Sequence, residues 1–180
     1  MSRKFSIKTQ NLRSLNLSNS TTSYKEKIKA SCHEKNGILL LTNCQIGNKE
    51  HLIKKEFLTT PNGPYHILTN SRSNTSAGVL IAVHNDLDAK IIDYKADNDN
   101  RLLIVKLQIN TDIFGVGVIY DYNHNTAHLL KQAKDLFNEL NCNQARILGG
   151  DMNVITDPVL DQRGYTGVHS RRKAAEMHET

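Results

Sequence analysis

Short apolar runs separated by polar turns make up most of this 180-residue chain. The first run, from Phe5 to Leu17, predicts a strand, and the Ser/Thr cluster after it offers an N-cap for a helix from Tyr24 to about Lys35. Gly37 ends that helix, and the run from Ile38 to Leu41 is wholly apolar, as expected of a strand buried on both faces. The N-terminal part therefore predicts a β-α-β arrangement.

Strand-like runs with short polar connections follow. They are Tyr65 to Leu68, Ala77 to Val83, Lys90 to Tyr94, Arg101 to Leu107 and Ile113 to Tyr120. Their succession predicts an antiparallel meander, with hairpin turns at Asp97 to Asn100 and at Asn110 to Asp112. An apolar stripe at helical spacing predicts a helix from Asn125 to Leu140, and Arg146 to Gly149 is the last clear strand.

The order β-α-β, meander, α-β predicts an α/β protein in which mixed sheets are covered by helices. No repeat or long low-complexity linker interrupts the chain, so residues 1 to 180 are expected to form a single domain.

The net charge of +5 is concentrated in the N-terminal third. Residues 1 to 60 contain eleven Lys or Arg and four Asp or Glu, whereas the remainder contains twelve and fourteen. Such a surplus favours polyanionic partners such as nucleic acid, although it is also compatible with an ordinary solvated face.

The cysteines Cys32, Cys44 and Cys142 are odd in number and widely spaced, which indicates neither a disulfide framework nor a zinc site. We therefore expect a reducing, intracellular location, nuclear or cytoplasmic. No apolar run of 18 residues is present, so no membrane span is expected.

The segment Gly149-Gly150-Asp151-Met152-Asn153 directly follows the last apolar strand. Asp151 and Asn153 are two residues apart, so an extended backbone points both toward one face. A carboxylate can hold a hard cation or accept a proton, and an amide can donate to a phosphoryl oxygen. An Asx turn at the start of a loop is the alternative interpretation.

Five segments, in this order, resemble the endonuclease/exonuclease/phosphatase superfamily and, more closely, the endonuclease domain of non-LTR (LINE-type) retrotransposons. They are Ser14 to Leu17, Leu40 to Ile46, Ser76 to Ile81, Val118 to Asn123 and Gly150 to Asn153. The resemblance implies a four-layer α/β/β/α sandwich of two mixed sheets flanked by helices. It also implies cleavage of DNA phosphodiester bonds by a water molecule, assisted by Mg²⁺ or Mn²⁺.

The same resemblance implies roles for individual residues. Asp151, Asn153 and Tyr120 are the implied catalytic residues: Asp151 orients or deprotonates the water, Asn153 contacts the phosphate, and Tyr120 lies beside it. Asn16 and Asn43 take the metal-binding positions. Asn123 and Arg163 are candidate substrate-binding residues, Arg163 because it belongs to a basic group that can contact a nucleic-acid backbone.

Two departures from the family pattern weaken the implied site. Asn43 stands where the family has its principal metal-binding glutamate, and a neutral amide is a poorer ligand for Mg²⁺. The family's C-terminal strands and their catalytic histidine have no counterpart before Thr180. The metal is therefore expected to bind weakly if at all, and cleavage is expected to be impaired or lost.

The sequence is compatible with three functions. The first is a retrotransposon-type endonuclease domain that lacks its C-terminal strands, acts on DNA and precedes a reverse-transcriptase domain in the parent protein. The second is a non-catalytic remnant that binds nucleic acid or protein. The third is a phosphatase or sphingomyelinase-like hydrolase of the same superfamily.

Overall fold

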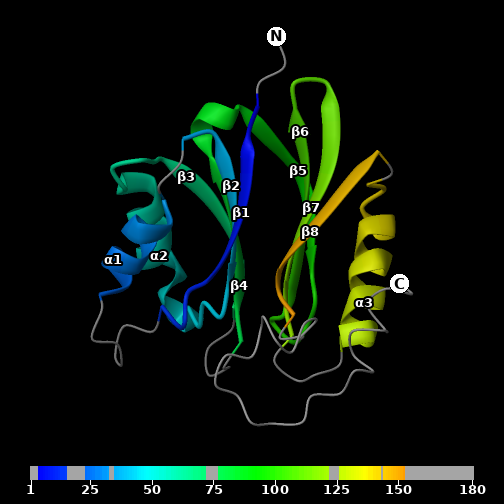
Figure 1. Cartoon of the computed structure of the whole chain (residues 1–180), viewed down its shortest axis with the longest axis horizontal. Coiled ribbons are helices and arrows are strands. Elements are labelled where there is room, and N and C mark those ends of the chain that lie inside the picture. Colours follow the sequence, from blue (N-terminus) through cyan, green and yellow to red (C-terminus); the bar gives the residue numbers. More distant parts are fainter. Residues whose placement is uncertain are drawn as a thin grey trace, which may run out of the picture.

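The computed structural model describes residues 4–15, 23–32, 35–71, 77–121, 126–142 and 144–152. These residues form two four-stranded sheets that pack face to face. Two helices cover the outer face of one sheet and a third covers the outer face of the other (Figure 1). The prediction of a four-layer α/β/β/α sandwich with two mixed sheets is confirmed.

The first sheet has the strand order β1-β2-β4-β3. Its strands are β1 (Ser6–Asn11), β2 (Gly37–Thr42), β3 (Tyr65–Asn70) and β4 (Val79–His84). β1 and β2 are parallel, and the other pairs are antiparallel. Every residue of β2 and β4 is buried. For β2 this confirms the prediction from the apolar run Ile38 to Leu41 that the strand is buried on both faces.

The second sheet has the order β5-β6-β7-β8. Its strands are β5 (Ala89–Ala96), β6 (Leu102–Ile109), β7 (Asp112–Tyr120) and β8 (Ala145–Asp151). β5, β6 and β7 form two antiparallel hairpins whose turns are the ones that the sequence predicts. β8 is parallel to β7 and occupies the edge of the described sheet.

The predicted meander of five strands is wrong in one respect, because it is divided between the two sheets. β3 and β4 belong to the first sheet, and β5 to β7 belong to the second. A short 3-10 helix, η2 (Asn85–Leu87), joins β4 to β5, and Asp88 after it has a φ of 51°. The change of sheet thus occurs at this connection, between β4 of the first sheet and β5 of the second.

Three α-helices complete the layers: α1 (Tyr24–Ser31), α2 (Glu50–Thr59) and α3 (Thr126–Glu139), with a 3-10 turn η1 (Gly47–Lys49) leading into α2. Ser23 and Glu26 form a capping box at the start of α1, as the Ser/Thr cluster predicts. α1 is shorter than predicted because it ends at Ser31 and not near Lys35. Within the described ranges, no helix is long and apolar enough to cross a membrane.

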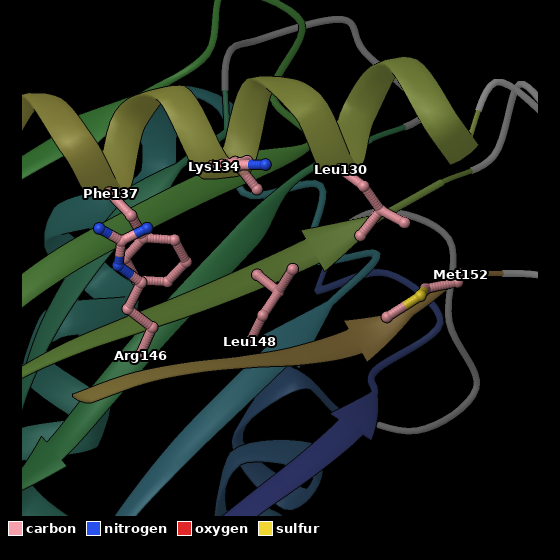
Figure 2. A pocket seen from close by; sticks show the side chains of 7 residues that line it. Leu130, Lys134, Phe137, Arg146, Leu148 and Met152 are labelled. Carbon is pink, nitrogen blue, oxygen red and sulfur yellow. The ribbon is translucent and has the colours of Figure 1, made fainter. Parts of the chain in front are cut away.

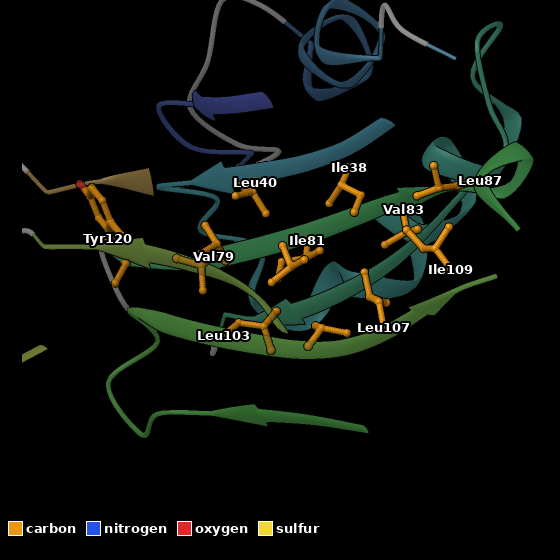
Figure 3. Close-up of a cluster of buried hydrophobic side chains, with 14 residues drawn as sticks. Ile38, Leu40, Val79, Ile81, Val83, Leu87, Leu103, Leu107, Ile109 and Tyr120 are labelled. Carbon is orange, nitrogen blue, oxygen red and sulfur yellow. The ribbon is translucent and has the colours of Figure 1, made fainter. Parts of the chain in front are cut away.

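The main core lies between the two sheets. Alternate residues of β2, β4, β6 and β7 point into it, among them Leu40, Ile81, Leu103 and Val118 (Figure 3). A second apolar cluster lies beneath α1 and α2, and a third lies beneath α3. In α3 the buried residues Leu129, Ala133 and Phe137 follow the predicted apolar stripe.

Candidate functional site

The carboxyl ends of four strands meet at one end of the sandwich. β1 and β2 are parallel, so Asn11 and Thr42 end them side by side. β7 and β8 are parallel as well, so Tyr120 and Asp151 end them side by side. A hydrogen bond between Asn11 and Asp151 joins the two pairs across the sheets. The structure therefore brings the ends of β1, β2, β7 and β8 together at one end of the sandwich.

Asp151 is the half-buried carboxylate at the centre of this end. Its Oδ2 accepts a hydrogen bond of 2.8 Å from Nδ2 of Asn11. The side-chain Oδ1 of Asn11 accepts from the backbone N–H of Arg13 at 2.9 Å. Because both ends of the amide are engaged, Asn11 holds the carboxylate of Asp151 in a defined orientation.

Asn11 is a site residue that the sequence interpretation does not include. The predicted first strand runs to Leu17, but β1 ends at Asn11, and Arg13 and Ser14 have φ values of 50° and 74°. These left-handed residues turn the chain before it reaches Asn16. No local signal marks Asn11 as the last residue of the strand, because apolar alternation is already lost after Ile7 whereas β1 continues to Asn11.

Tyr120 lies opposite Asp151 in the β7–β8 ladder. It is 9% exposed and belongs to the core cluster between the sheets, and its side-chain oxygen lies at the outer end of that cluster (Figure 3). The ring is thus held by packing while its polar end reaches the rim where Asp151 emerges.

Asn43 begins the loop after β2, where it is half-buried. Its Oδ1 accepts from Nε2 of Gln45 at 3.0 Å, and its backbone oxygen accepts from the N–H of Ser14 at 2.7 Å. Asn43 and Gln45 have φ values of 54° and 48°. Asparagine tolerates this region better than most residues do, which gives a backbone reason for Asn at this position.

Hydrogen bonds connect the loop after β1 to the loop after β2 and to α1. Leu15 N donates to the carbonyl of Cys44 at 2.7 Å, continuing the pairing beyond the strands. Lys27 of α1 donates from Nζ to the carbonyls of Arg13 and Ser14 at 3.1 and 2.6 Å. Left-handed non-glycine residues held by surrounding contacts are characteristic of binding and catalytic loops.

Asp121 follows Tyr120 and is fully buried. Its Oδ2 accepts from Oγ1 of Thr126 at 2.6 Å, and its N–H donates to the carbonyl of Asp151 at 2.9 Å. Asp121 therefore ties the start of α3 to the end of β8.

A polar cluster at the same end links the two sheets. Asn70, the last residue of β3, donates from Nδ2 to Oδ1 of Asp97 at 2.8 Å and to the carbonyl of Leu102 at 2.9 Å. Oδ1 of Asp97 also accepts from the backbone N–H groups of Arg101 and Leu102, both at 2.9 Å. The β5–β6 turn is therefore anchored to the first sheet, and it shapes one wall of this end.

Gly149 and Gly150 make room for the strand that carries Asp151. A Cβ at Gly149 would lie 2.7 Å from Cγ2 of Thr9 and 2.8 Å from Cδ1 of Leu40, both in the opposite sheet. Gly150 has a φ of 149°, and a Cβ there would collide with the carbonyl oxygen of Ile119. The glycines thus allow β8 to approach both the opposite sheet and β7.

The described donors do not fit a divalent-cation centre. Asp151 supplies one carboxylate, whereas Asn11 and Asn43 supply neutral amide oxygens that already accept hydrogen bonds. No group of three or more His, Cys, Asp or Glu side chains that could hold a metal ion occurs in the part of the chain that the structure describes. Mg²⁺ prefers charged oxygen ligands in a near-octahedral set, which these residues do not provide.

The predicted site residues Asn16, Asn123, Asn153 and Arg163 lie outside the described residues. Of the predicted set, the structure brings together Asp151 and Tyr120 and places Asn43 after β2, the strand that pairs with β1.

No protein-family model and no curated protein matches the chain. Solved structures do match it. AP endonuclease LMAP from Leishmania major superposes with a TM-score of 0.65 at 15% identity, covering 95% of this chain and 64% of its own. A functionally unknown conserved protein from Enterococcus faecalis gives a TM-score of 0.56 at 16% identity, covering 83% and 67%.

A third match is ANGEL2, a 2′,3′-cyclic phosphatase in complex with adenosine-2′,3′-vanadate, with a TM-score of 0.53 at 17% identity. It covers 71% of this chain and 43% of ANGEL2. The chain spans about half the length of the TDP2 structures that it also matches, from 43% to 56%. The likenesses to AP endonuclease LMAP, the Enterococcus faecalis protein and ANGEL2 show that the chain shares their fold.

Proposed function

We propose that the chain carries part of a retrotransposon-type endonuclease site that acts on DNA phosphodiester bonds, and that cleavage by this chain is impaired or absent. The observation that supports the site is the hydrogen bond of 2.8 Å between Asn11 and Asp151 at the joined strand ends. The fold supports the phosphodiesterase class, since AP endonuclease LMAP and the 2′,3′-cyclic phosphatase ANGEL2 share it. The retrotransposon assignment rests on the sequence resemblance.

Each residue of the site has a chemical task under this proposal. Asp151, held by Asn11, accepts a proton from the attacking water or orients it. Tyr120, packed in the core with its polar end at the rim, contacts the phosphate. Asn153, Asn16, Asn123 and Arg163 complete the proposed set. Mg²⁺ or Mn²⁺ belongs to this chemistry by the sequence resemblance, but the described donors do not fit such an ion, so no step is assigned to it.

A plasmid-relaxation assay with Mg²⁺ tests the proposal. We expect little or no nicking by the 180-residue chain. Nicking that Asp151→Ala abolishes and Asp112→Ala leaves intact would establish the site and show that the chain is a competent nuclease. Asp112 is a suitable control because it is an exposed carboxylate at the opposite end of β7. Robust nicking that survives Asp151→Ala would refute the role of Asp151.

The variant Asn43→Glu tests the metal position directly. It adds a carboxylate where the sequence resemblance places a metal ligand, at a left-handed φ of 54° that costs about 1 kcal/mol for most residues. We expect Mg²⁺ to raise the Tm of Asn43→Glu and to leave that of Asn43→Gln unchanged. Equal responses of the two variants would show that residue 43 does not face a cation site.

The second candidate function is a non-catalytic remnant that binds nucleic acid or protein. It is supported by Asn43, which stands where the sequence resemblance has a metal-binding glutamate, and by the basic N-terminal third. Salt-sensitive DNA binding that Asp151→Ala and Asn16→Ala leave unchanged would favour it, and no binding at low salt would count against it. A phosphatase or sphingomyelinase-like activity is supported by the fold alone.

Two further expectations concern the parent protein and the cellular location. A downstream reverse-transcriptase domain in the parent protein, and a nuclear or cytoplasmic location, follow from the retrotransposon assignment. Sequencing the reading frame beyond Thr180 tests the first, and imaging a tagged chain tests the second.

A further inference from the structure

An apolar groove of about 440 Å³ lies between α3 and the edge strand β8, and its Met152 end adjoins the strand end that carries Asp151 (Figure 2). Its lining residues are Leu130, Ala133, Lys134, Phe137, Arg146, Leu148 and Met152. Leu148 lies between the two elements in this view, Arg146 and Phe137 lie toward one end, and Met152 lies at the other. The groove therefore runs along β8.

β8 offers a backbone edge beside this groove. Within the described part of the second sheet its one neighbour is β7. The residues of β8 are half-buried or exposed, whereas the second half of β7 is fully buried. A strand with one neighbour directs about half of its backbone N–H and C=O groups outward. These groups can pair with an added strand.

The charges around the groove indicate which side chains an added strand would carry. Arg146 is exposed and stacks over the ring of Phe137 at 5.8 Å, with Nε bonded to the carbonyl of Cys142 and Nη2 to Oδ1 of Asn138. Lys134 is exposed on α3 and makes no ion pair with any described residue. Among the described residues, no carboxylate lines the groove. The complement is therefore an apolar surface flanked by negative charge.

We propose that the groove and the edge of β8 together bind an extended acidic and apolar segment of a partner protein by strand addition. The segment pairs its backbone with β8. Its apolar side chains, on one face, enter the groove against Leu148 and Met152, and its carboxylates meet Lys134. An edge strand beside a helix is a geometry that peptide-binding domains use for this purpose. Seven residues of β8 span about 23 Å, enough for roughly six residues of partner.

Fluorescence anisotropy with the whole chain tests this proposal. The probe is a labelled peptide with glutamate, valine and leucine at alternate positions and threonine between them. We expect saturable binding that Lys134→Glu weakens by about fivefold or more, because the charge contact becomes repulsive. Lys131→Glu is the matched control: it makes the same charge change on an exposed residue of α3 that does not line the groove.

Two further probes separate the proposal from simple charge attraction. A peptide with lysine in place of glutamate is expected to bind Lys134→Glu more tightly than the unmodified chain. A peptide N-methylated at alternate residues is expected to lose binding, because it cannot pair with β8.

Three outcomes would overturn the proposal: no saturable binding, equal binding of the N-methylated peptide, or displacement of the peptide by a single-stranded oligonucleotide whose own binding depends on Lys134. The last outcome would assign the groove to nucleic acid. Thermal melting of each variant confirms that the comparison is made between folded proteins.

Discussion

Asn11 and Asp151 are 140 positions apart in the chain and are joined by a hydrogen bond of 2.8 Å between Nδ2 and Oδ2. One residue ends β1 in the first sheet and the other ends β8 in the second. The bond thus connects the sheets at the end where the loops with left-handed residues gather. It also places an amide donor, and not a second carboxylate, next to Asp151.

The variant Asn11→Asp is expected to destabilise the protein and to make it sensitive to Mg²⁺. Two carboxylates at hydrogen-bond distance repel each other at neutral pH, and the amide donor is lost, so the free energy of unfolding should fall by about 1 to 2 kcal/mol. A cation would bind between the carboxylates and restore stability. Urea unfolding with and without Mg²⁺ measures both effects.

Asn110→Asp is the control for that experiment. Asn110 is exposed in the β6–β7 turn at the opposite end of the sandwich, and its φ of 55° suits Asp as well as Asn. It should change neither the stability nor the response to Mg²⁺ appreciably. If Asn11→Asp is as stable as Asn110→Asp, Asn11 does not hold Asp151 in solution.

Gly149→Ala is expected to destabilise the protein through the contact between the sheets. The added methyl group would lie 2.7 Å from Cγ2 of Thr9 and 2.8 Å from Cδ1 of Leu40, an overpacking that costs about 1 to 3 kcal/mol. Thr9→Ser removes the Cγ2 atom, so the cost of Gly149→Ala should be smaller in that background. A double-mutant cycle by chemical denaturation measures this coupling. Strict additivity of the two substitutions would show that residues 9 and 149 are not in contact.

The layers of the fold were predictable from the sequence because they depend on local patterns. Each of three elements is recognisable from residues close together in the sequence: β2 from its apolar run, α1 from its N-terminal cap and α3 from its apolar stripe. α2 was missed as a complete helix, although its buried Ile53 and Phe57 have the i, i+4 spacing that predicts one. The division of the meander was not predictable, because strand pairing depends on contacts between distant residues.

Some residues of the candidate site were also predictable from the sequence, and others were not. Asp151 and Tyr120 were predictable because each follows an apolar strand directly. Asn11 was not, because its importance comes from where β1 stops, and that is determined by the left-handed Arg13 and Ser14 and by the pairing of Ser14 with Asn43. The burial of Asp121 likewise depends on the position of α3, which a strand pattern does not contain.

Thr126→Val is expected to be strongly destabilising because it removes a hydrogen-bond donor from a buried carboxylate. Oγ1 of Thr126 donates to Oδ2 of Asp121 at 2.6 Å, and both residues are almost inaccessible to solvent. Loss of the donor to a buried acceptor costs about 1 to 3 kcal/mol, and valine preserves the shape of threonine. Thr126→Ser keeps the hydroxyl and should recover most of the loss. If Val and Ser give the same unfolding midpoint in urea, the hydrogen bond does not contribute to stability.

Alkaline pH is expected to destabilise the protein in part through Cys32. Burial raises the pKa of the Cys32 thiol to about 12, whereas the thiol of an unfolded chain titrates near 8.5. The unfolded state therefore loses this proton first, so the stabilisation is complete below about pH 8.5 and is lost as the pH rises toward 12. The slope is about 1.4 kcal/mol per pH unit within that window.

Cys32→Ala isolates this effect. The variant lacks the thiol, so its free energy of unfolding should fall less steeply with pH than that of the unmodified chain, whatever the cost of the substitution at neutral pH. Tyrosine and lysine titrations are common to both proteins and cancel in the difference. Urea unfolding under reducing conditions at about pH 8 and about pH 10 measures it. If both proteins lose stability in parallel over this range, the Cys32 thiol is not protected from ionisation by burial.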